Sequence, residues 1–342
     1  MKSNRNIAIE ALRFLMIMQI CFWHYHGSGL AAGYLGVEFF FILSGVFTYK
    51  LSGKPDAPGA IAYTMRKVKK FYPLYLAGVI IAIMACRAVW RDADLVPKVI
   101  VDALMLQSVG IFKGTSANGP LWFFSVLIYG GAIVYTLCRN LRTLSLNLIF
   151  PALILMFLVY SFDSGAGNGL EMWHNEGPLP LPLLRGICEM GIGVLLGHII
   201  ANYGNVLSRH LGALNAATSI SAIGYLSVLF FGASHAALAV IFICVLIAAS
   251  LTQSSWIYRL FSGRTWLSLG ALAYPIYVIH LPLGKVVDAV AHYFPSPLSE
   301  HPVILMALFI LPVGWMLDKA VVLIIRLAGY AFANRPRSGM PR

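Results

Sequence analysis

An arginine and a histidine stand inside the first apolar segment of the chain, where a membrane helix would carry hydrocarbon side chains. Arg13 and His24 are eleven residues apart within the segment Ile7–Tyr25. Eleven residues make almost three turns of an α-helix, so both side chains are expected on one face, roughly 16 Å apart along the axis. An ionisable residue inside a membrane span is costly unless it faces a polar interior, and it marks a functional site by default. Snorkelling or a structural hydrogen bond would explain either residue alone, whereas two on one face favour a functional pair.

A carboxylate, Glu38, follows in the second apolar segment, at about the depth of His24. The connection between the two segments is short, residues 27–32, so the two helices are expected to be antiparallel neighbours. Histidine is the side chain whose unperturbed pKa lies nearest neutrality, which suits it to take a proton from a hydroxyl. A carboxylate can hold the imidazole in one tautomer and stabilise its cation. We therefore predict that Glu38 orients His24.

A basic run precedes the third apolar segment. It consists of Arg66, Lys67, Lys69 and Lys70, and Tyr72 follows it directly. Taken alone, such a run is a topology signal that also binds anionic lipid. Its functional interpretation is a seat for a phosphorylated ligand.

Two aromatic groups are candidates for lining a cavity. Trp122 opens a segment in the manner of an interfacial aromatic residue. Tyr274, Tyr277 and His280 recur at three-residue intervals around Pro275, and three polar tips on one flank of a proline-bent helix are typical of a lined cavity.

One external loop is acidic and holds Asp163, Glu171, His174 and Glu176. The spacing of His174 and Glu176 is not that of metal ligands on a helix. We expect this loop to face substrate, and we expect no metal site.

The elements that must position these residues are membrane helices. The chain of 342 residues is 59% hydrophobic and 11% charged, and its apolar residues fall in continuous blocks about twenty residues long, which indicates a polytopic, all-α membrane protein. Residues 1–330 form the predicted transmembrane domain, and residues 331–342 a basic cytoplasmic tail. Ten spans are expected: 7–25, 34–51, 71–90, 120–138, 146–162, 185–202, 211–231, 235–252, 267–286 and 302–326.

The distribution of basic residues orients these spans. With both termini cytoplasmic, seventeen Lys and Arg fall on the cytoplasmic side and five fall outside. This asymmetry follows the positive-inside rule, so the net charge of +12 reflects topology and not a nucleic-acid partner. The five cysteines stand singly without metal or disulfide spacing and are interpreted as packing residues.

Five stretches in order resemble the acyltransferase-3 family of integral membrane O-acyltransferases. The first is Arg13 with His24, and the second is Gly36-Val37-Glu38-Phe39-Phe40-Phe41-Ile42-Leu43-Ser44-Gly45. The others are the basic run ending Phe71-Tyr72-Pro73, then Pro120-Leu121-Trp122-Phe123, and Ala273-Tyr274-Pro275-Ile276-Tyr277-Val278-Ile279-His280.

The resemblance implies a stand-alone enzyme of a bacterial inner membrane that moves an acyl group, commonly acetyl, from cytoplasmic acyl-coenzyme A to a hydroxyl of an envelope or exported glycan. From the residues themselves we predict His24 as a general base or transient acyl carrier, with Glu38 and Arg13 as the other catalytic residues. The resemblance also implies an acetyl-CoA site and a substrate site. The expected acetyl-CoA contacts are Arg66, Lys67, Lys70 and Tyr72, and the expected substrate contacts are Trp122, Tyr274, Tyr277 and His280. A thioester is already activated, so no metal is required.

The chain departs from the family pattern in two places. Relatives carry an arginine where this chain has Lys70, which keeps the charge but loses the bidentate fork for phosphate. Val126-Leu127-Ile128-Tyr129 replaces the Ser-Val-Glu-Glu of relatives fused to an esterase-like domain.

Two other classes of function remain open from the residues. In a transporter of lipid-linked glycans or small solutes, Arg13, Glu38 and His24 would form a proton or substrate path. In a non-enzymatic assembly subunit the same polar groups would only pair helices. The sequence does not name the acceptor glycan, the hydroxyl, the acyl chain or the oligomeric state. Membrane lipid and the glycan are the expected partners.

Overall fold

A computed structural model describes residues 5–25, 29–85, 95–110, 116–163, 180–232, 236–296 and 298–333. Helices make up 84% of the structure, and its described residues contain no strand. An apolar chain in lipid must satisfy its backbone groups within each segment, which a helix does. The predicted all-α membrane fold is confirmed.

The helices follow one another with short connections. Their bounds are α1 (Ile7–Trp23), η1 (Gly33–Leu35), α2 (Gly36–Ser52), α3 (Ala60–Ala85), α5 (Leu95–Ala103), η2 (Gly119–Leu121), α6 (Trp122–Asn140), α7 (Arg142–Leu144), η3 (Ser145–Ile149), α8 (Phe150–Asp163), α9 (Leu181–Arg209), α10 (Leu211–Phe231), α11 (Ala236–Leu251), α12 (Trp256–Leu260), α13 (Thr265–Ala271), α14 (Ala273–Val290), η5 (Ala291–Tyr293) and α15 (Pro302–Ala333).

Each of the ten predicted spans overlaps a helix. Within the described residues, seven helices are long and apolar enough to cross a membrane, or up to eight if the bent pair α13 and α14 is one span. Helix α1 has only 17 residues and contains Glu10 and Arg13, and α11 has 16 residues. The structure therefore supports a multi-pass protein, while the count of ten and the side of each terminus stay predictions.

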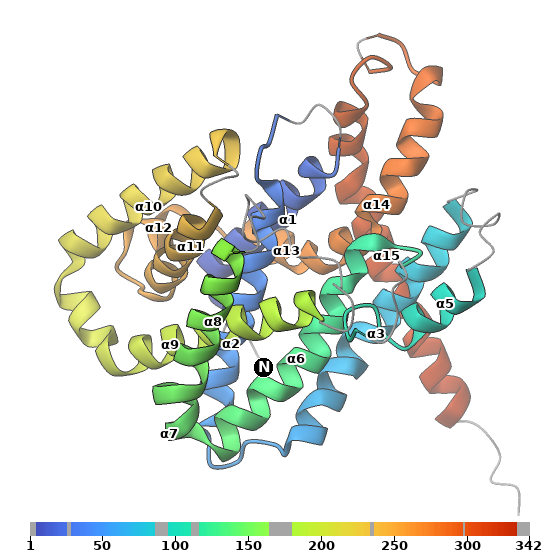
Figure 1. Cartoon of the computed structure of the whole chain (residues 1–342). Coiled ribbons are helices and arrows are strands. Elements are labelled where there is room, and N and C mark those ends of the chain that lie inside the picture. Colours follow the sequence, from blue (N-terminus) through green and yellow to red (C-terminus); the bar gives the residue numbers. More distant parts are fainter. Residues whose placement is uncertain are drawn as a thin grey trace, which may run out of the picture.

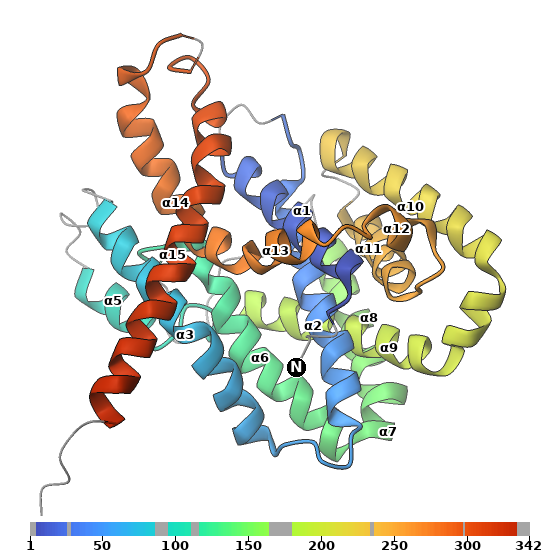
Figure 2. The ribbon, with the colours of Figure 1, turned by 180° about the vertical axis from the view of Figure 1, so that it is seen from behind.

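The helices form a central group with a lobe on either side (Figure 1). Helices α1, α2 and α6 occupy the middle, α9 to α12 lie on one side, and α3, α5, α14 and α15 lie on the other. The reverse view shows the same order (Figure 2). The residues predicted to be functional come mainly from the central group and from its neighbours α3 and α14.

Helices α2 and α9 touch through glycines. A Cβ atom added to Gly45 would lie 2.0 Å from the carbonyl oxygen of Met190, and one added to Gly193 would lie 1.9 Å from that of Ile42. Membrane helices associate through close packing, and small residues allow their backbones to approach. These two glycines therefore determine how closely α9 packs against α2.

The structure corrects the predicted start of the third helix. The predicted span begins at residue 71, whereas α3 begins at Ala60 and includes the whole basic run. Lysine and arginine are good helix formers, so the charged segment continues the apolar helix by about three turns. The basic side chains therefore point in several directions around one helix.

The predicted bend around Pro275 lies upstream of the proline. Helices α13 and α14 meet at Leu272 with an angle of 51° between them, and Pro275 falls in the first turn of α14. A proline has no N–H for the carbonyl four residues earlier and its ring clashes with that carbonyl. Here that residue is Ala271, the last of α13, so the helix breaks there and resumes at Ala273.

Candidate active site

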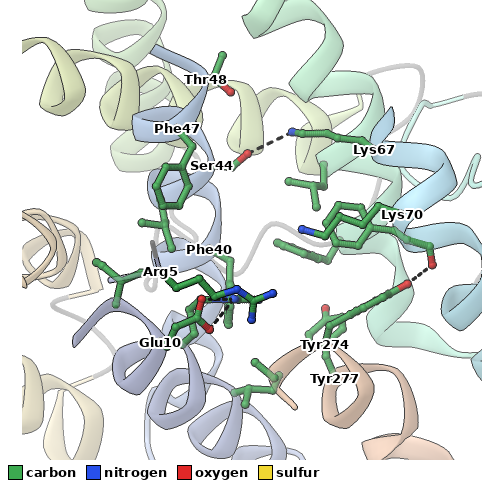
Figure 3. A pocket seen from close by; sticks show the side chains of 18 of the residues that line it. Arg5, Glu10, Phe40, Ser44, Phe47, Thr48, Lys67, Lys70, Tyr274 and Tyr277 are labelled. Carbon is green, nitrogen blue, oxygen red and sulfur yellow. Dashed lines mark hydrogen bonds and ion pairs between the residues drawn. The ribbon is translucent and has the colours of Figure 1, made fainter. Parts of the chain in front are cut away.

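A cavity of about 590 Å³ opens between α1, α2, α3, α6 and α14. Figure 3 shows it from close by, with Lys67 and Lys70 of α3 on one side, Ser44 and Phe47 of α2 on another, and Tyr274 of α14 at the end. Side chains far apart in the sequence therefore share one space.

The lining of the cavity is cationic and aromatic. It holds five basic side chains and one carboxylate, so its formal charge is positive. The basic residues are Arg5, Arg13, Lys50, Lys67 and Lys70, and the carboxylate is Glu10. The aromatic and large aliphatic residues are Phe40, Leu43, Phe47, Tyr63, Phe71, Phe123, Phe124, Leu127, Leu251, Tyr274 and Tyr277, with Ile9, Ile17 and Leu51.

Lys67 is held inside the cavity by two neighbours. Its Nζ donates to the Ser44 hydroxyl at 3.3 Å and lies 4.8 Å from the centroid of the Tyr63 ring. The Tyr63 hydroxyl in turn lies 3.1 Å from that of Thr48. A cation over an aromatic face is attracted to the ring, so Lys67 is fixed without an acidic partner among these contacts and its charge faces the cavity.

The basic run divides between the cavity and the surface. Lys67 and Lys70 line the cavity. Arg66 and Lys69 are exposed, as is Lys70, but unlike Lys70 they are not among the lining residues, because the helical rotation carries them to other faces of α3. Tyr72 does not line it either, since its hydroxyl donates to the carbonyl oxygen of Ala103 at 2.9 Å. The structure therefore separates Arg66 and Tyr72 from the predicted group.

Arg13 reaches the cavity from α1. Its Nη1 lies 2.8 Å and 3.1 Å from the two carboxylate oxygens of Glu10, one turn earlier on the helix. This pair leaves the Arg13 side chain 27% exposed. Arg13 therefore faces the cavity as half of an ion pair and not as an isolated charge.

Aromatic rings line the end of the cavity that adjoins α14. The Tyr277 hydroxyl donates to the carbonyl oxygen of Pro120 at 2.6 Å, and its ring packs against Phe123 and Phe124 at centroid distances of 5.4 Å and 5.6 Å. The Tyr274 hydroxyl donates to the carbonyl oxygen of Phe71. Both tyrosines are fixed through their polar tips, so their rings present a rigid apolar wall.

The loop that leads into α6 is held by a buried carboxylate. Asp102 accepts hydrogen bonds from the Gln107 side chain at 2.9 Å and from the Ala117 N–H at 2.8 Å. Burial raises the pKa of Asp102, and these hydrogen bonds oppose the rise. Next to them, the Asn118 amide donates to the carbonyl oxygen of Val278 at 3.0 Å. The start of α6, and with it Trp122, is thereby tied to α14.

His24 lies at the C-terminal cap of α1 and is exposed. Its ring centroid is 4.8 Å from that of Trp23 and 5.1 Å from that of His280. His280 follows Tyr277 by one turn of α14, and their rings are 5.5 Å apart. Of the three residues predicted to line a cavity, Tyr274 and Tyr277 do so, whereas His280 lies outside the lining, between Tyr277 and His24.

The predicted contact between Glu38 and His24 is wrong. Glu38 is completely buried and pairs with Arg185 of α9. The same guanidinium bonds Glu189 at 2.8 Å and lies 5.6 Å from the centroid of the Trp122 ring. A guanidinium offers five donors in a rigid fork, and it engages Glu38 more strongly than the weaker and more distant imidazole would. Trp122 therefore belongs to this ionic group and does not line the cavity.

Several residues of the site were not anticipated. Arg5, Lys50 and Glu10 line the cavity but were not among the predicted site residues. Arg185 and Glu189 are intramembrane charges four residues apart on one helix, a signal that was available in the sequence.

The acidic loop with Glu171, His174 and Glu176 lies outside the described residues, apart from Asp163 at the end of α8. Among the described residues, no group of three or more His, Cys, Asp or Glu side chains is arranged to hold a metal ion.

A comparison with protein families matches residues 6–318 to a family model described as "Acyltransferase domain". No curated protein matches the chain, and no solved structure does so. The match covers every residue that lines the cavity except Arg5, and it includes His24 and His280.

Proposed function

Because the chain belongs to the acyltransferase-3 family and is a membrane acyltransferase, we propose that its donor is acyl-coenzyme A and its acceptor a glycan hydroxyl. Acetyl is the acyl group we propose first. The enzyme would work in a bacterial inner membrane, with the donor on the cytoplasmic side and the envelope or exported glycan on the other. Residues 1–330 would form its single catalytic domain.

The observation that carries the donor is the lining of the cavity. Five basic side chains against one carboxylate suit a polyanion, and lysines bind phosphate as point charges. The aromatic and aliphatic lining can pack against the methylene and methyl groups of the long arm that carries the thioester, an arm that also holds two amides. Acyl-CoA combines both features, with its phosphates at one end and the acyl group at the other.

The positions of the basic residues agree with the proposed side of entry. Arg5 precedes α1, Lys50 lies in the last turn of α2, and Lys67 and Lys70 lie in the first half of α3. All four belong to the end of the molecule that the positive-inside rule makes cytoplasmic. A donor entering there would extend its acyl end toward Tyr277.

His24 is the proposed base. It is exposed beyond the aromatic end of the cavity, where an acceptor hydroxyl could approach it from the opposite side. Its imidazole would take the hydroxyl proton as the acceptor oxygen attacks the thioester carbonyl carbon. The alternative of a transient acyl group on His24 is tested by trapping: an acyl-imidazole would appear as labelled protein after denaturation with acetyl-CoA alone, and a base would leave the protein unlabelled.

The function is tested with membrane vesicles that contain the protein. Acetyl-CoA labelled in its acetyl group is added to the cytoplasmic face, with envelope polysaccharide from cells that lack the protein as acceptor. We expect label in the polysaccharide that mild alkali releases, because esters are alkali-labile, together with one free thiol for each ester. Vesicles without the protein are the control. A transporter would leave the donor intact. A polysaccharide without label would therefore refute the acyltransferase proposal and favour a transporter.

A further inference from the structure

A second histidine stands between His24 and the cavity. His280 is 1% exposed, and its Nδ1 lies 2.7 Å from the carbonyl oxygen of Tyr277. A carbonyl oxygen only accepts hydrogen bonds, so Nδ1 carries the proton and Nε2 carries a lone pair. The hydrogen bond thereby fixes the tautomer of this imidazole.

The lone pair of His280 has no hydrogen-bond partner among the described residues. Nε2 is buried and makes no hydrogen bond with any described residue. Native proteins rarely leave a buried acceptor unsatisfied, and each exception calls for an explanation. A structural role is fulfilled by Nδ1 alone, so Nε2 is the atom that remains to be explained.

His280 lies between His24 and Tyr277. On one side is the exposed ring of His24, at a centroid distance of 5.1 Å. On the other side is the ring of Tyr277, at 5.5 Å, and Tyr277 lines the cavity. An exposed imidazole, a buried imidazole and the end of the cavity therefore follow one another in that order.

The proton balance of acyl transfer gives such a series a use. The acceptor oxygen forms a bond to the acyl carbon and loses its proton, while the carbon–sulfur bond breaks and the thiolate must gain one. If acceptor and donor approach from opposite ends, as the proposed function has it, the proton has to move inward between them. One imidazole can make both transfers only where it reaches both atoms, and two imidazoles in series divide the transfers between the acceptor side and the sulfur side.

We propose that His280 is the general acid of the reaction. His24 takes the hydroxyl proton, His280 receives it at Nε2, and the same nitrogen gives it to the departing thiolate. The products are the ester and the thiol, and both imidazoles return to their neutral form. Nδ1 keeps its hydrogen bond to Tyr277 throughout. The inference rests on the proposed function and adds to it the residue that serves the leaving group.

The test uses two donors that differ in their need for a proton. Acetyl-CoA leaves as a basic alkyl thiolate, whereas S-acetyl-4-nitrothiophenol leaves as a weakly basic aryl thiolate that departs unprotonated. Full-length protein in membrane vesicles is assayed with both, using polysaccharide from cells that lack the protein as acceptor. The variant His280→Gln keeps an N–H donor for the Tyr277 carbonyl oxygen but has no basic nitrogen.

With acetyl-CoA we expect His280→Gln to lose about 100-fold or more in kcat, the usual contribution of a general acid, at nearly unchanged KM. With the aryl thioester we expect a loss below about tenfold, because a good leaving group needs little acid catalysis. His24→Ala should be inactive with both donors, since the base is needed in either case. His198→Gln is the matched control and should equal the parent, because that histidine contacts Tyr49 on another helix pair.

Two results would overturn the inference. One is full activity of His280→Gln with acetyl-CoA, and the other is an equal loss with both donors in a variant that still binds acetyl-CoA, which indicates a structural role. If the Gln variant does not bind acetyl-CoA because it misfolds, His280→Asn decides by the same comparison. A parent protein that transfers nothing from acetyl-CoA would instead refute the proposed function, and the inference with it.

Discussion

Neighbouring lysines of α3 differ in where they lie, and this difference separates donor binding from topology. Lys67 and Lys70 line the cavity, whereas Lys69 is exposed outside it. We expect Lys67→Gln with Lys70→Gln to raise the KM for acetyl-CoA by about tenfold or more, because a charge-assisted hydrogen bond contributes roughly 1.5–3 kcal/mol. The kcat should change little, since phosphate contacts are the same in the ground state and the transition state.

The matched control removes the same charge from the same helix. The Lys69→Gln variant, alone or with Arg66→Gln, should keep the parental KM, because neither side chain lines the cavity. Both sets are measured as initial rates against acetyl-CoA concentration. Equal KM values in the two sets would mean that the basic run acts only on membrane orientation.

The structure gives Glu38 a different partner from the one predicted from the sequence. Because it pairs with Arg185 and not with His24, Glu38→Gln should leave the pH at which activity rises unchanged. A carboxylate beside the imidazole would have favoured its cation, and its removal would then have moved that rise to lower pH. The measurement is kcat/KM for both enzymes between about pH 5 and 9, a range that includes the ordinary titration of an imidazole. A rise shifted to lower pH would restore Glu38 as the partner of His24.

The same ionic group predicts a ranking of stabilities. Arg185 serves two buried carboxylates, Glu38 and Glu189, so Arg185→Leu leaves both without a cation. Removing one partner of a buried pair costs about 3–5 kcal/mol. Thermal unfolding in detergent should therefore show a much lower midpoint for Arg185→Leu than for Glu38→Gln, which keeps the Arg185 to Glu189 pair. A similar midpoint for the two variants would contradict the geometry.

At this scale the sequence identified residues but not all of their partners. Arg13, His24 and Glu38 are ionisable residues in apolar segments. The free-energy cost of placing them there singled them out as candidate site residues. The partner of Glu38 stands 147 positions away, and no pattern along α2 indicates which helix packs against it. Short-range pairs such as Arg185 and Glu189, at helical spacing, were open to prediction.

At the scale of the elements, glycines determine how closely helices α2 and α9 pack. Gly45 and Gly193 bring α2 and α9 into backbone contact, and α2 carries both Ser44 of the cavity and Glu38. Gly193→Ala should destabilise the protein by about 1–3 kcal/mol, the usual cost of overpacking, because its Cβ would lie 1.9 Å from the Ile42 carbonyl oxygen. Activity should fall as well, since α2 shifts relative to the cavity.

The control for this prediction lies on the same helix. Gly204 of α9 has nothing within 4 Å of an added Cβ, and alanine is the better helix former. Gly204→Ala should therefore match or slightly exceed the parent in its thermal midpoint. If Gly193→Ala were as stable as Gly204→Ala, the close contact between the two helices would be refuted.

The helices themselves were largely predictable, because runs of about twenty apolar residues have no other solution in lipid. Two details were not. Helix α3 begins at Ala60, since a basic segment with good helix formers extends a helix beyond its apolar part. The break before α14 falls at Leu272 and not at Pro275, because the proline acts on the residue four positions earlier.

At the scale of the whole molecule, the proposed mechanism depends on two faces. The cavity with its basic residues should open to the cytoplasm, and the exposed His24 should face the other side. The helices long enough to span number seven or eight among the described residues, and a different number of crossings would exchange the sides of later loops. Orientation is therefore a separate question from the presence of helices.

Three exposed positions test the orientation in intact cells. We expect Lys54→Cys and Arg264→Cys to resist a membrane-impermeant thiol reagent added outside, because the basic loops are predicted to be cytoplasmic. Tyr293→Cys should react, since it follows α14 at the opposite end and is 79% exposed. After permeabilisation all three should react, which shows that each thiol is accessible.

The native cysteines set the background of this measurement. Cys21, Cys138 and Cys188 are buried, and the parent protein, which also contains Cys244 and Cys86, is labelled in parallel and subtracted. Helix α14 lies between positions 264 and 293 together with α13, so opposite labelling at these two positions means that the bent pair crosses the membrane as one span. Labelling of both from outside would instead make the pair re-entrant. The row from Tyr274 to His280 would then not lead from one face of the membrane to the other, and the inward transfer of the proton would lose its direction.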